Sequence, residues 1–152
     1  MVQLHAALAN GGFEVTPHVT STFNERVNKN PKKQFFSPEV SKIVLEWMES
    51  VVDKGSGSGV KIEGYRIAGK TGTSQKAFDG SYTSKKVCSF VATLPVNDPQ
   101  FAVLVVVDEP SKSYEYGSTV ALPVAKEISE SLIVIEKIPT KLKDHGMIVK
   151  KP

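Results

Sequence analysis

Several features are scarce in this 152-residue sequence, and each scarcity excludes a class of protein. Cys88 is the only cysteine, which excludes an internal disulfide and any zinc site built on several thiolates. Neither sign of charge is in large excess, because 19 basic and 16 acidic residues leave a net charge of only +3. So mild a charge does not indicate a nucleic-acid or anionic-membrane partner. The longest apolar run, Phe101 to Val107, is far shorter than the roughly 20 residues that span a bilayer.

What the chain does have is enough apolar sequence for one modest core. The hydrophobic fraction is 40%, and the length is that of one ordinary domain. The three histidines, His5, His18 and His145, are scattered without the spacing of metal ligands. We therefore expect no metal site and no cofactor, and we interpret Cys88 as a small core residue.

Three helices are predicted from helical spacing of apolar residues. The first occupies the N-terminal residues and stops at Asn10-Gly11-Gly12, since glycine adopts the left-handed C-cap without steric cost. It has no start signal and no signal peptide precedes it, so we expect the natural sequence to begin further upstream. Ser37 and Pro38 open the second helix as cap and first helical residue. Its predicted apolar stripe is Val40, Ile43, Val44, Trp47, Met48 and Val51.

The third helix is predicted at about Ser118 to Ile135, with Pro123 in its first turn. Ser118 can cap it. Its apolar residues at helical spacing are Ala121, Val124, Ala125, Ile128 and Leu132.

Three strands are predicted between the second and third helices, after a flexible Gly/Ser loop at residues 55–59. They lie within Lys61 to Thr73, at Val87 to Leu94 and at Phe101 to Asp108. The last is continuously apolar, which is typical of a strand buried on both faces. The short connections predict an antiparallel meander. A further short strand is possible at His18 to Phe23. The fold class is therefore α+β, a three-strand antiparallel meander backed by helices.

One stretch carries chemistry, Gly69-Lys70-Thr71-Gly72-Thr73-Ser74 at the end of the first predicted strand. A K-T-G triplet accompanies S-x-x-K and S-D-N-type motifs in serine enzymes that react with β-lactams. The triplet alone is a weak signal. Its setting is more specific, because two further strands, Asp108-Glu109-Pro110 and Tyr116-Gly117 follow it before the last helix.

This succession resembles the class B penicillin-binding proteins, the monofunctional peptidoglycan D,D-transpeptidases, over roughly Gln3 to Pro139. The string G-K-T-G-T-S-Q leans slightly towards the cell-division branch. The resemblance implies a partial β-lactamase/transpeptidase-like fold. It further implies that residues 1–139 are the C-terminal part of the transpeptidase domain and that 140–152 form a solvated basic tail.

Roles for the strand follow from the resemblance together with residue chemistry. The substrate would be a stem peptide ending in D-Ala-D-Ala, which pairs with an exposed strand edge. Lys70 supplies positive charge, and the hydroxyls of Thr71 and Thr73 can donate to the terminal carboxylate. Gly72 leaves room for the peptide to approach. By resemblance, the Thr73 N–H forms half of the oxyanion hole. Tyr114 and Tyr116 could contact substrate at the rim.

The nucleophile motifs of the family are missing from these 152 residues. The only S-x-x-K is Ser58-Gly59-Val60-Lys61, in the Gly/Ser loop, where we expect no helix to hold the serine against the lysine. No S-x-N triplet exists, and Thr22-Phe23-Asn24 is the nearest imitation. We expect the chain to be inactive alone, with the nucleophile on sequence upstream.

Two alternatives stay open: a fragment of a serine β-lactamase or D,D-carboxypeptidase, and a non-catalytic binding or structural module. The resemblance implies stem peptides and β-lactams as ligands of the complete domain. It also implies a parent protein that is anchored at the extracytoplasmic face of the bacterial membrane and belongs to a cell-wall synthesis complex. No nucleic-acid partner is expected.

Overall fold

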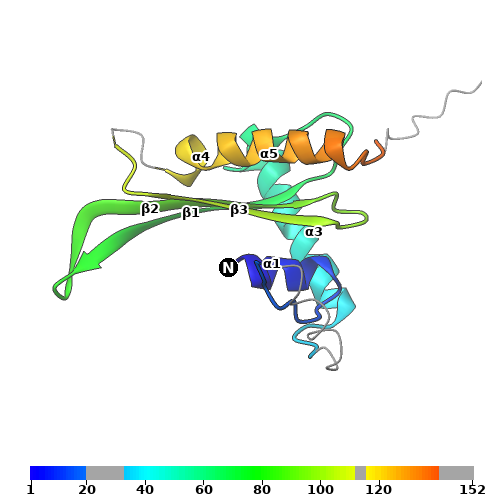
Figure 1. The fold of residues 1–152 in the computed structure, drawn as a ribbon, viewed down its shortest axis with the longest axis horizontal. Helices are drawn as coiled ribbons and strands as arrows, with labels where there is room; N and C mark the ends of the chain where they lie inside the picture. The colour runs from blue at the N-terminus through cyan, green and yellow to red at the C-terminus, as the bar shows by residue number, and fades with distance from the viewer. Residues whose placement is uncertain (20–32, 112–115, 141–152) are drawn as a thin grey trace, which may run out of the picture.

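A three-stranded antiparallel sheet lies between two layers of helices in the computed structural model, which describes residues 1–19, 33–111 and 116–140 (Figure 1). The strand order is β1-β2-β3. The helices α4 and α5 cover one face, called upper here, and α1 lies against the other, called lower (Figure 1). The elements are α1 (Val2–Ala9), α3 (Pro38–Lys54), η2 (Ser58–Val60), β1 (Ala68–Phe78), β2 (Ser81–Leu94), β3 (Phe101–Asp108), α4 (Gly117–Val120) and α5 (Leu122–Ile135). The meander and the α+β class are confirmed.

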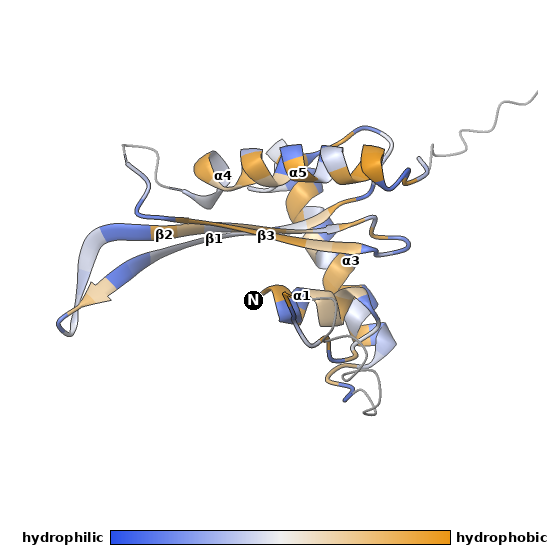
Figure 2. Cartoon of the chain, in the orientation of Figure 1, coloured by the Kyte–Doolittle hydropathy of each residue, from blue (hydrophilic) through white to orange (hydrophobic). Residues whose placement is uncertain are grey.

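Each face of the sheet has its own apolar core, and Figure 2 shows hydrophobic residues along the central strands between the helix layers. The upper cluster consists of Val52, Val60, Ile67, Phe90, Ala92, Leu94, Ala121, Leu122, Ala125, Ile133 and Ile138. The lower cluster consists of Leu8, Leu45, Met48, Ala68 and Val91. Cys88 is fully buried, in agreement with its interpretation as a core residue.

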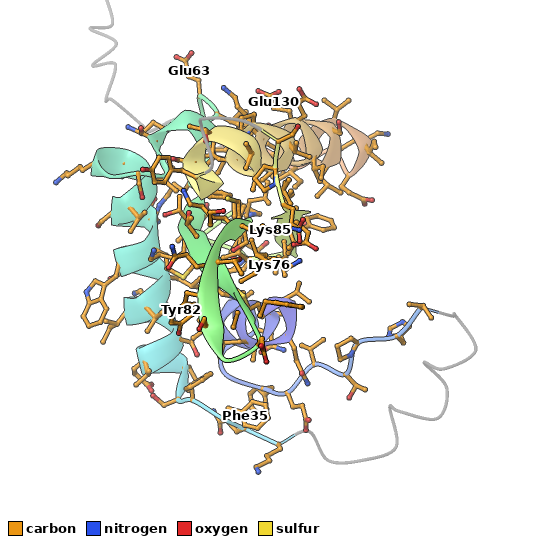
Figure 3. All side chains as sticks on the ribbon, turned by 90° about the vertical axis from the view of Figure 1, so that its left-hand side faces the viewer. Phe35, Glu63, Lys76, Tyr82, Lys85 and Glu130 are labelled. Carbon is orange, nitrogen blue, oxygen red and sulfur yellow. The ribbon has the colours of Figure 1, made fainter. Side chains whose placement is uncertain are left out.

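Helix α3 contributes to both cores. Leu45 and Met48 belong to the lower cluster, whereas Val52, one turn further on, belongs to the upper cluster. The helix therefore passes the sheet at the start of β1, as Figures 1 and 3 both show. Its C-terminal end brings the Gly55–Gly59 loop to the upper side, beside β1.

The predicted buried face was wrong for most of α3. The buried side chains are Ser41, Leu45, Met48 and Val52, so only Met48 of the predicted stripe is buried. Val40, Ile43 and Trp47 are 46%, 45% and 69% exposed. Ser41 is only 1% exposed, and a serine makes the buried row look less hydrophobic than the exposed one. The caps were correct, since the Ser37 hydroxyl accepts from the Val40 N–H and Pro38 begins the helix.

The apolar stripe predicted for α5 was correct in part, since Ala121 and Ala125 are fully buried. In α5 the buried residues include Leu122 and Ser129, whereas Val124 and Ile128 of the predicted stripe are 43% and 38% exposed. The Ser129 hydroxyl donates to the Ala125 carbonyl within the helix, so it is satisfied where it is buried. In α1, Ala7 and Leu8 are buried together with His5, while Val2 and Leu4 are 37% and 49% exposed.

The last helix is two helices, with a break at Ala121. Pro123 lies in the first turn of α5, as predicted. Ser118 is not a cap, because Tyr116 is the N-cap of α4 and Thr119 completes the capping interaction. The predicted single helix from Ser118 therefore misplaced the start of the regular α5.

The β1–β2 hairpin is longer than predicted and projects beyond the helix layers (Figure 1). Strand β1 starts at Ala68, not Lys61, and continues to Phe78. The turn is Asp79-Gly80, with φ of 49° and 74°. Positive φ at both central residues is the geometry of a type I′ hairpin, for which Asp-Gly is a strong signal.

Strand β3 is not buried on both faces, contrary to the prediction. It is an outer strand of the sheet, most of its side chains are half-buried, and Val106 is 53% exposed. Of the predicted strand His18 to Phe23, the described residues His18 and Val19 are not in a strand, and the remainder lies outside the described residues. Within the described residues, no helix is both long and apolar enough to cross a bilayer.

Candidate active-site strand

The Gly69–Ser74 stretch lies in β1, which is the other outer strand of the sheet. No described strand pairs with its outward edge. Lys70 and Thr73 are exposed and Thr71 and Gly72 are half-buried, so the edge is open to a partner after the point where α3 passes. A cavity of about 370 Å³ lies elsewhere, between α1, the start of α3 and the β2–β3 turn, and residues 69–74 do not line it.

Lys70 and the two threonines project from opposite faces of the strand. Lys70 lies opposite Val91 of the lower cluster, and Thr71 lies opposite Phe90 of the upper cluster. Since side chains alternate along a strand, Thr73 shares the upper face with Thr71. The Lys70 ammonium donates to the Thr71 carbonyl at 2.8 Å. A peptide at this edge would therefore have hydroxyls on one side and the lysine on the other.

The hydroxyl of Thr73 is held by the start of α4. The Gly117 N–H donates to Thr73 Oγ1 at 3.0 Å. A backbone N–H can only donate, so the Thr73 hydroxyl keeps its own proton for another acceptor.

The hydroxyl of Thr71 is in contact with the loop that follows α3. Its Oγ1 lies 3.1 Å from the Ser56 Oγ, and either hydroxyl could donate. Sequence reasoning missed Ser56 because the loop was interpreted as a flexible connector.

Gly117 allows α4 to approach the strand closely. A Cβ on Gly117 would lie 2.4 Å from the Ser89 carbonyl oxygen and 2.6 Å from that of Gly72. A Cβ on Gly72 would lie 2.5 Å from the Ser89 Oγ. The structure thus gives a second reason for a glycine at position 72, besides substrate access. Its lack of a side chain leaves space for the Ser89 hydroxyl on β2.

A cluster of charges lies beyond Ser74, where β1, β2 and the end of β3 meet. The Lys76 ammonium contacts Asp108 at 3.0 Å and Glu109 at 2.8 Å, and Lys85 contacts Glu109 at 2.8 Å. Figure 3 shows Lys76 and Lys85 close together on the hairpin. Hydrogen bonds from Lys76 and then Lys85 lower the pKa of Glu109 to about 2. Nothing in the spacing of these residues along the chain pointed to this cluster.

The rejected S-x-x-K is also unsuited to catalysis in the structure. Ser58 opens a 3₁₀ helix of three residues, which ends at Val60, before Lys61. Lys61 donates to the Asp53 carbonyl at 2.9 Å and pairs with the Asp53 carboxylate at 3.8 Å. The lysine is thus engaged on the side of α3.

Other candidate residues have ordinary surroundings. Tyr116 is 57% exposed, and the Lys86 ammonium lies 5.3 Å from its ring centroid. His5 is buried, with Nδ1 3.0 Å from the Met1 carbonyl oxygen. Among the described residues, no group of histidine, cysteine and carboxylate side chains could hold a metal ion. Further predictions lie outside the described residues, namely those for Thr22-Phe23-Asn24, Tyr114, His145 and the basic tail from residue 141 onward.

Comparison with known proteins agrees with this geometry. The family model described as "Penicillin binding protein transpeptidase domain" matches residues 1–130. The chain therefore belongs to the penicillin-binding transpeptidases, and the relatives place it with the class B, FtsI-type enzymes of cell division.

Two curated relatives and one solved structure illustrate the likeness. A "peptidoglycan D,D-transpeptidase FtsI homolog" of Mesostigma viride is 40% identical over 93% of this chain and 27% of that protein. Stage V sporulation protein D of Bacillus subtilis is 39% identical over 81% of this chain and 20% of that protein. The apo TP domain of Burkholderia pseudomallei penicillin-binding protein 3 superposes with a TM-score of 0.73 and 28% identity, over 93% of this chain and 43% of that domain. The chain thus spans about a quarter of the length of these curated relatives.

Proposed function

We propose that residues 1–139 serve as the C-terminal part of a peptidoglycan D,D-transpeptidase domain and that the β1 edge binds the stem peptide. The observation that carries this proposal is the open outer edge of β1, with the hydroxyls of Thr71 and Thr73 on one face. A peptide backbone can add to such an edge as a further strand. The names of the relatives support the choice of a stem peptide as the partner.

The roles of the site residues follow from their placement. Thr71 and Thr73 donate to the terminal carboxylate of the D-Ala-D-Ala stem from the upper face. Lys70 adds positive charge from the lower face, so it acts beside the carboxylate and not in line with the hydroxyls. The Thr73 N–H serves as one oxyanion donor, and losing one such donor costs about 10²–10³-fold in turnover in a characterised serine protease. Gly72 has no side chain, so it adds no bulk to the strand between the hydroxyls and the lysine.

The nucleophile of the reaction is proposed to lie outside these 152 residues. The Lys61 ammonium is engaged with Asp53, so the Ser58 motif lacks the free amine that must take a hydroxyl proton. Two charge-assisted bonds contribute about 1.5–3 kcal/mol each. Association costs about 4–15 kcal/mol. Residues 1–152 alone therefore have negligible affinity for a stem peptide or a penicillin.

The parent protein is proposed to work at the extracytoplasmic face of the bacterial membrane, where the peptidoglycan lies. Membrane anchoring and membership of a cell-wall synthesis complex belong to the same proposal. They rest on the family alone.

Labelling with a fluorescent penicillin tests the proposal. Residues 1–152 should take no covalent label. A hybrid domain, in which residues 1–140 replace the matching part of the Bacillus subtilis relative, should be labelled. In the hybrid domain, Lys70→Ala should slow acylation by at least about tenfold, as expected for loss of a charged contact. Its urea midpoint should stay unchanged, because the side chain is exposed.

The relative's own transpeptidase domain serves as the positive control for labelling. A labelled band from residues 1–152, or full-speed acylation of the Lys70→Ala hybrid, would contradict the proposed roles. A folded hybrid domain that takes no label would favour a non-catalytic module.

A further inference from the structure

The Gly55–Gly59 loop is held in a defined conformation beside the active-site strand. The Gly57 N–H donates to the Val51 carbonyl at 3.1 Å, and the Ser58 N–H donates to the Gly55 carbonyl at 3.2 Å. Val60, at the end of the same turn, is fully buried in the upper cluster. Contacts at both ends therefore fix Ser56 between them.

This loop reaches β1 because α3 passes the edge of the sheet. Val52, in the last turns of α3, lies 3.1 Å from where a Cβ on Gly69 would be, so the helix end packs directly against the strand. Two residues after Gly69, Thr71 Oγ1 meets the Ser56 Oγ at 3.1 Å. Both hydroxyl-bearing residues are partly open to solvent, so a ligand can reach Thr71 from outside.

The hydroxyls of Thr71 and Thr73 have similar surroundings, because each has one described hydrogen-bond partner. A hydroxyl has one proton to donate and can accept as well. At Thr73 the Gly117 N–H fills an acceptor position, which leaves the Thr73 proton for a ligand. At Thr71 the only described partner of the hydroxyl is Ser56. Without substrate, either hydroxyl of this pair can donate to the other.

We propose that Ser56 is a positioning residue for the transpeptidase reaction, whose hydroxyl donates to Thr71 Oγ1 when substrate binds. The Thr71 hydroxyl then has a single direction for its own proton, towards the substrate carboxylate. A hydroxyl that accepts one bond is also a better donor in the next, since chained hydrogen bonds polarise one another. This inference rests on the proposed function of the β1 edge.

Acylation of the hybrid domain by benzylpenicillin tests the proposal with a double-mutant cycle. Ser56→Ala should lower the second-order acylation rate about three- to tenfold, the range of one neutral hydrogen bond. Ser56→Thr should restore most of the rate, because it keeps the hydroxyl. Ser58→Ala, an exposed serine in the same turn, is the matched control and should have the wild-type rate. In a Thr71→Val background, Ser56→Ala should have no further effect, since Ser56 acts only through Thr71.

A second measurement uses residues 1–152 directly. Amide hydrogen exchange at Ser58 should be faster in both Ser56→Ala and Thr71→Val, because each loses the bond that ties the turn to β1. Unchanged exchange in both variants would show that the bond is absent in solution and would overturn the inference.

The outcomes separate the inference from the proposed function. A wild-type hybrid domain that takes no penicillin would count against the function of the strand. A hybrid that acylates normally with Ser56→Ala, or that slows equally with and without the Thr71 hydroxyl, would overturn the role of Ser56 alone.

Discussion

At the candidate active-site strand, single residues matter for their small size as well as for their chemistry. A Cβ on Gly72 would overlap the Ser89 hydroxyl, and only the lack of a Cβ on Gly117 lets α4 come close to the Ser89 and Gly72 carbonyl oxygens. This close approach allows the Gly117 N–H to reach Thr73 Oγ1. Gly117 therefore has a structural task at the candidate site, namely to hold the Thr73 hydroxyl in place.

Gly117→Ala should destabilise residues 1–152 by about 1–3 kcal/mol, the usual cost of overpacking a tight contact. The added methyl would have to move α4 away from the Ser89 and Gly72 carbonyl oxygens. Urea unfolding followed by circular dichroism measures the change. Ser118→Ala, one residue later in the same short helix, should stay within about 0.5 kcal/mol of wild type. Equal stability of the two variants would show that the approach is looser than described.

At the scale of secondary structure, the sequence predicted the order of elements better than their orientation. The Ser37-Pro38 start of α3, the Asn10-Gly11-Gly12 stop of α1 and the three-strand meander are confirmed. The predicted buried face was wrong for most of α3 and for part of α5, because each helix presents two apolar rows and a serine lies in the row that packs. Hydrophobicity alone cannot rank such rows, since the choice depends on which one fits closely against the sheet.

The candidate site, too, could be predicted from the sequence only in part. Lys70, Thr71, Gly72 and Thr73 could be recognised because a contiguous motif is visible in the chain. Ser56 could not, because its contact with Thr71 joins residues 15 apart and exists only once α3 has passed the sheet edge. Long-range placement of this kind depends on tertiary packing, which no local pattern records.

Ion pairs join the β1–β2 hairpin to the end of β3. The stability of the chain should therefore depend on pH. Glu109 has a pKa of about 2 in the folded chain, below its ordinary value of 4.5, so its contribution is complete above 4.5 and lost as the pH falls towards 2. The difference in urea midpoint between wild type and Glu109→Gln should therefore shrink over this window. Added salt should shrink it too, because the cluster is exposed.

Glu63→Gln is the matched control for this titration. Glu63 is exposed, forms no ion pair with the other described residues and projects away from the hairpin (Figure 3). The urea midpoint of Glu63→Gln should equal that of the wild type at each pH in the same range. A constant difference between wild type and Glu109→Gln from pH 4.5 to 2 would show that the charges of Glu109 do not bind Lys76 and Lys85 in solution.

At the scale of the whole molecule, two surfaces besides the β1 edge remain open in the described part of the chain. The outer edge of β3 has no described partner strand, and Val106 on this strand is 53% exposed. Trp47 and its neighbours form an apolar row on α3 that faces away from the cores. Unpaired strand edges and exposed apolar rows promote association. Residues 1–152 are therefore expected to bind hydrophobic dyes and to self-associate.

Val106→Lys should reduce self-association of residues 1–152, because a lysine on an edge strand opposes pairing with another chain. Light scattering at increasing protein concentration measures the effect. Val134→Lys adds the same charge at a site 75% exposed on α5, away from the strand edge. An equal reduction by both variants would attribute the effect to net charge and not to the edge.

The passage of α3 across the sheet edge ties the two layers into one cooperative unit. Met48 packs below the sheet and Val52 above it, within little more than one turn of the same helix. Loosening either layer frees part of α3 and so removes support from the other. Thermal melting should accordingly proceed as a single event, in which the Thr71 and Thr73 hydroxyls lose their geometry only when the entire scaffold comes apart.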